Sequence, residues 1–495
     1  MLERTKIKWV YAISVIFIAL NVYFMLRDVY WTLLIPVLAM TLYLYFYSMD
    51  KILLLIAFFT PIAINLTDVQ FGLGISLPTE PLMAGVLALF IIKLFYSNDY
   101  DRKILKHPLT IVILLSLAWM FITSLTSEIP VVSIKALTAR LWFVVPFYFL
   151  GILLFRKLTN IRSFIWLYTI PLVGVIIYTT YNHYLWGFSE QSGHWVMEPF
   201  YNDHTAYGAI LALFIPVFVG FSFTRTYSKT LRFFSFLVLA ILIMALVLSF
   251  SRAAWVSLAF AVLIYLVIAL KIKLKWILLT FGILLSFFFL FQNNIWEKLE
   301  KNKQGSSANF LEHVQSISNV TTDDSNLERL NRWASAIRMF RERPVLGFGP
   351  GTYQFEYAPF QRYSEKTRIS TNAGDKGNAH SEYIGPLAES GVLGAFWVVC
   401  ILVLVVLTGL RVYKRTESKE IKMLSLSVLL GLVTYYFHGT MNDFLDTDKA
   451  SVPFWGFIAI LVALDLYYLP KGKTEVGSKI SEVGSQKSEV RSQNS

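Results

Sequence analysis

His380 is the residue best suited to proton transfer in this chain. It lies in Asn378-Ala-His-Ser-Glu-Tyr383, where a polar segment meets an apolar one. The imidazole of histidine gains and loses protons near neutral pH, so His380 is a candidate general base. A lone histidine at such a border is more often a helix cap or a packing residue, so that structural interpretation stays open.

Arg252 is the sharpest isolated charge, because it separates two otherwise unbroken apolar runs in Leu248-Ser-Phe-Ser-Arg-Ala-Ala-Trp255. A guanidinium offers a planar fork that matches two phosphate oxygens, which suits an anion clamp at the mouth of a membrane cavity. The alternative is an arginine that reaches to lipid headgroups. Arg140 is a similar candidate for which the structural alternative is stronger.

A polar helix is predicted after the capping-box pattern Ser325-Asn-Leu-Glu328, and Pro344 ends it. Arg329 and Arg332 are three residues apart and share one flank. Spacing alone favours a surface helix with solvated arginines. Two further features follow this helix. The glycine-rich turn 347–351 could let the backbone approach a ligand, and Glu389 lies inside an apolar run, where a carboxylate is functional or paired.

The elements that position these residues are apolar runs of membrane-spanning length. Apolar residues make up 56% of the 495 residues and charged residues 15%. Lipid forces the backbone to satisfy its own hydrogen bonds, so helices are the default. We predict an all-α polytopic membrane protein with about 14 (12–14) transmembrane helices and one large, mostly helical periplasmic loop. The predicted spans are 8–26, 30–47, 51–66, 80–96, 109–126, 138–155, 161–184, 204–223, 231–250, 253–270, 274–292, 384–410, 421–439 and 452–469.

The loops alternate between basic and acidic, which is the positive-inside pattern. It places both termini in the cytoplasm and the polar segment outside, and it accounts for most of the net charge of +12, so nucleic-acid binding is not expected. The sequence contains neither a Gly-x4-Gly-Lys-Ser/Thr loop nor a strand-borne Gly-x-Gly-x-x-Gly motif, which argues against an ATP-driven pump. The expected parts are a helix bundle (1–292), a periplasmic loop domain (293–382), further spans (383–469) and a disordered cytoplasmic tail (470–495).

Three stretches resemble the O-antigen ligase and polymerase superfamily of bacterial inner-membrane glycan transferases. These are Ser251-Arg-Ala-Ala254, the helix from Arg329 with the Arg343-Pro-Val-Leu-Gly-Phe-Gly-Pro-Gly351 turn, and Asn378-Ala-His-Ser-Glu-Tyr followed by Leu387-Ala-Glu-Ser-Gly391. Tyr201-Asn-Asp-His-Thr205 is a weaker fourth. The predicted crossings exceed the ten to twelve typical of the family.

The resemblance implies a metal-independent, inverting enzyme that needs no cofactor. It would move a glycan from an undecaprenyl-pyrophosphate carrier to an acceptor on the periplasmic side of the inner membrane. The acceptor would be a glycolipid such as lipid A–core, or a growing polysaccharide. By this resemblance His380 is the general base, and Arg252 and Arg329 hold the pyrophosphate. Substrate contacts are expected from Arg140, Arg332, Glu389, Tyr383 and Asn378.

Three alternatives stay open. The first is a polysaccharide polymerase of the same superfamily, which shares these motifs. The second is a metal-dependent glycosyltransferase that uses polyprenyl-phosphate sugars, for which Asp446-Thr-Asp448 offers two hard oxygen ligands. The third is a transporter, which would show intramembrane charges and inverted repeats.

Overall fold

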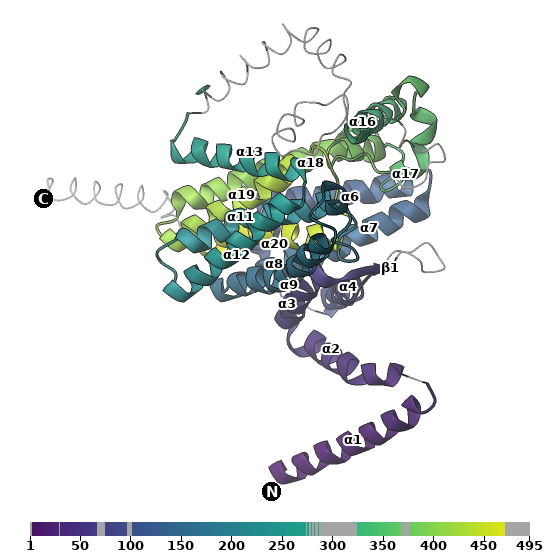
Figure 1. Cartoon of the computed structure of the whole chain (residues 1–495), viewed down its shortest axis with the longest axis vertical. Coiled ribbons are helices and arrows are strands. Elements are labelled where there is room, and N and C mark those ends of the chain that lie inside the picture. The colour runs from purple at the N-terminus through teal and green to yellow at the C-terminus, as the bar shows by residue number, and fades with distance from the viewer. Residues whose placement is uncertain are drawn as a thin grey trace, which may run out of the picture.

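The computed structural model describes residues 2–28, 30–66, 75–96, 101–273, 324–367, 370 and 377–470, with single positions 275, 276, 279, 282 and 286. Helices dominate, and α1 extends away from a tight bundle formed by the later helices (Figure 1). The one sheet in the described part is an antiparallel pair of three-residue strands, β1 and β2. The structure therefore confirms the predicted all-α polytopic class.

The elements before the polar segment run as follows: α1 (Leu2–Met25), η1 (Trp31–Leu34), α2 (Ile35–Tyr47), α3 (Met49–Phe59), η2 (Thr60–Ile62), β1 (Ile64–Leu66), β2 (Ile75–Leu77), α4 (Thr79–Tyr96), α5 (Arg102–Leu105), α6 (Pro108–Leu125), α7 (Pro130–Val144), η3 (Val145–Leu150), α8 (Gly151–Leu154), α9 (Leu158–Leu185), α10 (Glu190–Gly193), α11 (His204–Phe223), α12 (Lys229–Leu248) and α13 (Arg252–Ala269).

The remaining elements are α16 (Asp324–Glu342), α17 (Tyr353–Glu356), η4 (Ala358–Phe360), η5 (Tyr363–Glu365), α18 (Ile384–Arg415), α19 (Lys419–His438) and α20 (Asp448–Tyr467).

Within the described residues, eleven helical stretches are long and apolar enough to cross a membrane. They correspond to eleven of the predicted runs, from α1 to α20. The run expected at 138–155 begins earlier, because α7, the π-helical η3 and α8 form one stretch, Pro130–Leu154. This places Arg140 inside a span.

Two predicted spans are not single membrane-length helices. Segment 30–47 forms η1 and the 13-residue α2. Segment 51–66 forms the 11-residue α3, which gives way at Thr60–Ile62 to the turn before β1. An 11-residue helix is about 16 Å long, too short for a hydrocarbon core of about 30 Å. The run at 274–292 lies mostly outside the described residues.

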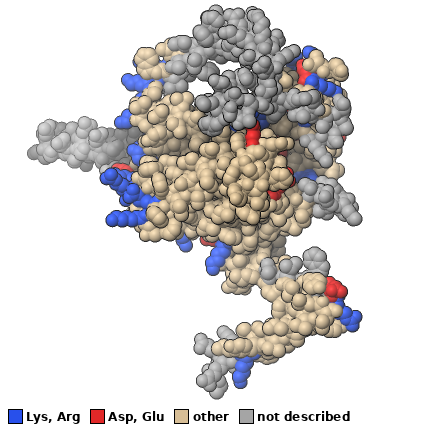
Figure 2. Space-filling model, viewed as in Figure 1, with Lys and Arg blue, Asp and Glu red and all other residues tan. Residues whose placement is uncertain are grey.

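The centre of the bundle is formed by α11, α19 and α20, whose side chains are mostly buried. On the face shown in Figure 2, residues other than Lys, Arg, Asp and Glu cover most of the bundle, and lysine and arginine side chains lie mostly along its outline. At the end where α18 and α20 finish, Asp465 binds His107 at 3.1 Å and Arg411 at 3.0 Å. His107 and Arg411, which lie far apart in the sequence, therefore meet at Asp465 at one end of the bundle.

The described part of the predicted outer domain lies at the opposite end. There α16 and α17 pack beside the beginning of α18 (Figure 1). The first half of the predicted 293–382 segment, residues 293–323, lies outside the described residues.

Candidate active site

Arg252 is the first residue of α13, and close packing fixes the turn that carries it. Phe250 has a φ of 49°, which reverses the chain between α12 and α13. A Cβ atom added to Gly208 of α11 would lie 2.7 Å from Cβ of Ser251 and 3.1 Å from Cβ of Ala254. The small residues around Arg252 therefore let its helix start lie directly against α11.

Arg329 lies on α16, and its side chain contacts the loop that joins α19 to α20. Its Nε donates to the backbone oxygen of Met441 at 3.2 Å. In the same loop, the Asn442 amide is hydrogen-bonded to Nε2 of His438 at 3.1 Å, and His438 is fully buried. The positive charges of Arg252 and Arg329 both act on the side chain of His204, so the two arginines lie near the same residue.

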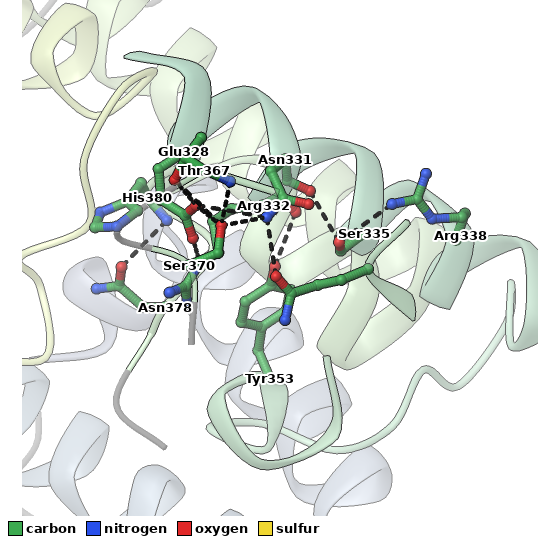
Figure 3. Close-up of polar contacts among 11 residues, drawn as sticks. Glu328, Asn331, Arg332, Ser335, Arg338, Tyr353, Thr367, Ser370, Asn378 and His380 are labelled. Atoms are coloured by element: carbon green, nitrogen blue, oxygen red, sulfur yellow. Dashed lines mark hydrogen bonds and ion pairs between the residues drawn. The ribbon is translucent and has the colours of Figure 1, made fainter. Parts of the chain in front are cut away.

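His380 lies in a turn whose shape is fixed by its neighbours. Its φ is 48°, a conformation that non-glycine residues rarely adopt. Oδ1 of Asn378 accepts the backbone N–H of His380 at 3.2 Å, and Oγ of Ser381 accepts the N–H of Ile384 at 3.3 Å. Asn378 therefore supports the histidine through the backbone (Figure 3).

The electrostatics of this turn keep the His380 imidazole uncharged. Burial, followed by the positive charges of Arg329 and Arg332, lowers its pKa to about 4, against the opposing influence of Asp203 and Glu328. At neutral pH the ring is therefore neutral and can accept a proton.

Asp203, which the sequence analysis did not select, reaches the same region from the start of α11. Its Oδ1 accepts the N–H groups of Thr205 at 2.7 Å and Ala206 at 2.8 Å, which fixes the carboxylate as a helix cap. His204 follows it and stacks on His194 with ring centroids 4.2 Å apart. The Tyr201–Thr205 motif was the available signal.

Arg332 is a buried ion-pair partner, so the expectation of a solvated arginine is wrong for this residue. Its Nε donates to Glu328 at 2.7 Å, and both side chains are 5% exposed. Ser370 and Thr367 also donate to Glu328 (Figure 3). These hydrogen bonds outweigh the effect of burial and lower the pKa of Glu328. Arg332 thus braces α16 while its charge acts on His380.

The glycine turn packs against α18. N–H groups of Phe348 and Gly349 donate to the carbonyls of Ala388 and Glu389, at 3.2 and 2.8 Å. Gly391, with a φ of 68°, lies too close to Val345 to leave room for a Cβ atom. These contacts explain the kink in α18 at Gly391.

Three predicted substrate-binding residues line a cavity away from His380. Arg140, Tyr383 and Glu389 line a space between α6, α7, α18, α19 and α20. The charges that act most strongly on Glu382 and Glu389 there are Arg140 and Asp446, whereas those acting on His380 are Arg329, Arg332, Asp203 and Glu328. Arg329 therefore acts on both His380 and His204, Arg252 acts on His204, and the three cavity-lining residues lie in another region.

The fold and this site define a class: a polytopic membrane protein with a neutral histidine and several arginines where a polar domain meets the bundle. Residues 237–399 match the family model of the O-antigen ligases, which confirms the resemblance and supports membership of that superfamily. The matched region includes Arg252, Arg329 and His380. This match supports, at the level of the family, an O-antigen ligase-like glycosyltransferase. No curated protein sequence matches the chain.

Proposed function

We propose that this protein transfers a glycan from an undecaprenyl-pyrophosphate carrier to an acceptor hydroxyl on the periplasmic side of the bacterial inner membrane. The observation that carries the proposal is the neighbourhood of His380, a neutral imidazole set among fixed positive charges. A pyrophosphate ester is already activated for displacement. Its enzyme needs a proton acceptor for the nucleophile and positive charge for the leaving group.

In the proposed reaction, the imidazole of His380 takes the proton from the acceptor hydroxyl. The hydroxyl oxygen forms a bond to the anomeric carbon while the bond from that carbon to the pyrophosphate oxygen breaks. The leaving pyrophosphate keeps the electron pair, and Arg252 and Arg329 stabilise its charge. A single displacement of this kind inverts the anomeric centre and uses no metal ion.

Donor binding would also strengthen the base. Arg329 and Arg332 lower the pKa of His380 because their positive charges oppose protonation. A bound pyrophosphate would offset those charges and raise the pKa of His380 toward its ordinary value. The imidazole would then become a better proton acceptor only when the donor is in place.

The geometry gives less support to the metal-dependent alternative. Asp446 is largely exposed and lies 3.5 Å from Arg140. Asp448 is buried and accepts a hydrogen bond of 2.5 Å from Thr79. The two carboxylates therefore have different partners. Within the residues that the structure describes, no group of three or more metal-ligating side chains is placed to hold an ion.

The direct test uses the purified full-length protein, a lipid-linked glycan donor and an acceptor glycolipid. Product should form in excess EDTA. Loss of activity in EDTA that magnesium or manganese restores would favour the metal-dependent class, and substrate movement without any transfer would favour a transporter. The surface glycans of a deletion strain separate the two family functions. Unattached lipid-linked polymer indicates a ligase, and a single repeat unit on the acceptor indicates a polymerase.

A further inference from the structure

Glu382, which follows His380 closely in the same turn, is tied to the loop that joins α19 to α20, residues 439–447. Its backbone N–H donates to the carbonyl of Gly439 at 2.8 Å. Its Oε1 accepts three hydrogen bonds, at 2.8, 3.0 and 3.0 Å, from the hydroxyl of Tyr435 and the N–H groups of Phe444 and Leu445. Glu382 therefore anchors this loop both at its beginning and near its end.

The middle of the same loop holds Arg329. The carbonyl of Met441 accepts from Nε of Arg329 at 3.2 Å. The next residue, Asn442, is hydrogen-bonded to His438 at 3.1 Å. Met441 lies between the two points that Glu382 anchors, so its carbonyl cannot shift without disturbing those bonds. The position of the Arg329 side chain thus depends on Glu382.

The contact between Glu382 and the loop is close. A Cβ atom added to Gly439 would lie 3.0 Å from Cγ of Glu382 and 3.4 Å from its Cβ. The neighbouring Tyr383 donates its hydroxyl to the carbonyl of Tyr436 at 2.9 Å, which ties the same turn to α19. The turn at residues 377–383 and the loop are therefore packed and hydrogen-bonded as one unit.

We propose that Glu382 is a positioning residue that fixes the distance between Arg329 and His380 by holding the loop. The inference rests on the proposed function, in which Arg329 stabilises the leaving pyrophosphate and His380 accepts the proton. Glu382 acts through Arg329 and does not touch the substrate. A misplacement of about 1 Å can cost roughly 10²-fold in rate, so a firm link between the two groups matters for catalysis.

The role of Glu382 requires an acceptor oxygen and not a negative charge. All three donors bond to Oε1, and the amide oxygen of glutamine can accept in its place. Burial raises the pKa of Glu382, although Arg140 opposes this effect, and a raised pKa favours the uncharged acid. An uncharged acceptor holds the loop without competing with pyrophosphate for Arg329. Glutamine should therefore replace Glu382, whereas methionine, which is of similar size but a poor acceptor, should not.

The first test measures the position of the loop in the purified full-length protein without substrate. Spin labels are attached after Arg341→Cys in α16 and Thr440→Cys in the loop, two exposed positions, in a Cys400→Ser background. Double electron–electron resonance then gives the distance distribution between the labels. We expect the distribution to broaden in Glu382→Met and to stay unchanged in Glu382→Gln.

Two further variants make this measurement specific. Glu389→Met is the matched control, because Glu389 lines the same cavity but its Oε1 accepts from the N–H of Tyr353 and not from the loop. It should leave the distribution unchanged. Tyr435→Phe removes one of the three donors to Glu382 and keeps the ring. It should broaden the distribution less than Glu382→Met, and it carries the test if the methionine variant does not fold.

Kinetic measurements then test whether Glu382 acts through Arg329. Glu382→Met should lower kcat/KM for the lipid-linked donor roughly 10- to 100-fold, and Glu382→Gln should stay close to the wild type. In an Arg329→Ala background, Glu382→Met should have almost no further effect, because residues that act as one unit are not additive.

Three results would overturn the proposal: an unchanged distance distribution in Glu382→Met, equal losses of activity in the methionine and glutamine variants, or losses in Glu382→Met and Arg329→Ala that multiply. Failure of the proposed function gives a different result. Arg329→Ala would then transfer glycan at the normal rate, while the broadened distribution in Glu382→Met would still show that Glu382 holds the loop.

Discussion

The turn at residues 377–383 divides two regions of opposite charge. On one side, Arg329 and Arg332 act on His380. On the other side, Glu382, Asp443 and Asp446 influence one another, with Arg140 as the nearby cation. Only one residue separates His380 from Glu382. The positive φ of His380 and the cap by Ser381 send the two side chains into different surroundings.

This division matters for the arginines proposed to bind pyrophosphate. Glu328 already pairs with Arg332, and further carboxylates next to Arg252 and Arg329 would neutralise them before a phosphate arrived. Keeping Glu382, Asp443 and Asp446 in a separate region preserves an anion site on the His380 side. We therefore expect substitutions near His380 to lower the transfer rate or the stability, and a substitution in the acidic region to raise the stability.

The largest effect should follow from His380→Ala. Loss of a general base costs roughly 10²–10⁴-fold in rate, and the variant should still insert and melt normally. Asn378→Ala is the positional control. It removes one hydrogen-bond acceptor from the turn, worth about 1 kcal/mol, and should slow transfer by less than about tenfold. Near-normal transfer by His380→Ala in an assay of the purified protein would place the base elsewhere.

The pH profile tests the same residue without a substitution. A base acts only when it is unprotonated, so activity is lost as pH falls through its pKa. With a pKa of about 4 in the free enzyme, kcat/KM should stay level from pH 8 down to about pH 5 on this limb. The corresponding limb of kcat should lie at higher pH, because bound pyrophosphate raises the pKa. Identical limbs would contradict coupling between donor and base.

Glu328→Gln should destabilise the His380 side. It leaves the buried charge of Arg332 without its carboxylate, and breaking a buried pair costs roughly 3–5 kcal/mol. Because the folded pKa of Glu328 is lowered, the wild-type advantage is present above the unfolded pKa and is lost as pH falls through the folded pKa. Thermal melting at pH 7 and at acid pH measures the difference. Glu365→Gln is a control, since its pair with Arg338 is more exposed.

Arg252 and Arg329 should respond to charge and shape separately. Alanine at either position should lower the transfer rate roughly 10²–10³-fold, as for loss of one donor to a transition-state oxyanion. Lysine keeps the charge but loses the two-point fork, so it should retain more activity than alanine and less than arginine. Arg140 lies in the acidic region, so Arg140→Ala should leave the affinity for pyrophosphate unchanged. Equal loss of pyrophosphate binding in all three alanine variants would mean that the two regions are one site.

Sequence reasoning found eleven of the spans, because apolar length leaves a strong local pattern. Apolar length identified α6 and α20, and residue type singled out Arg252 and His380. The sequence alone did not show that Glu389 and His380 belong to different regions, because the conformation of the turn at residues 377–383 decides which region each side chain faces. It also misread 51–66, because an apolar run fits a short helix with a strand as well as it fits a span. The burial of Arg332 was hidden because Ser370 and Thr367, which bind its ion-pair partner Glu328, lie far along the chain.

The smallest predicted effect is a gain in stability, and it comes from Asp443 in the acidic region. Oδ1 of Asp443 is buried without a hydrogen-bond partner among the described residues. Burial, followed by the charges of Glu382, Asp446 and Glu389, raises the pKa of Asp443 well above its usual range. Its raised folded pKa means that stability is full below the unfolded pKa and falls as pH rises through the folded value.

Asp443→Asn should therefore stabilise the protein at pH 8, by about 1–3 kcal/mol if the ionised group is the main cost. The gain should vanish in acid, where the wild-type carboxyl is protonated in both states. Melting curves of Asp443→Asn and Glu328→Gln against pH should move apart in opposite directions as the pH rises. A destabilised Asp443→Asn at pH 8 would show that this carboxylate is paired with a cation, and the division of charge proposed for the two sides would then fail.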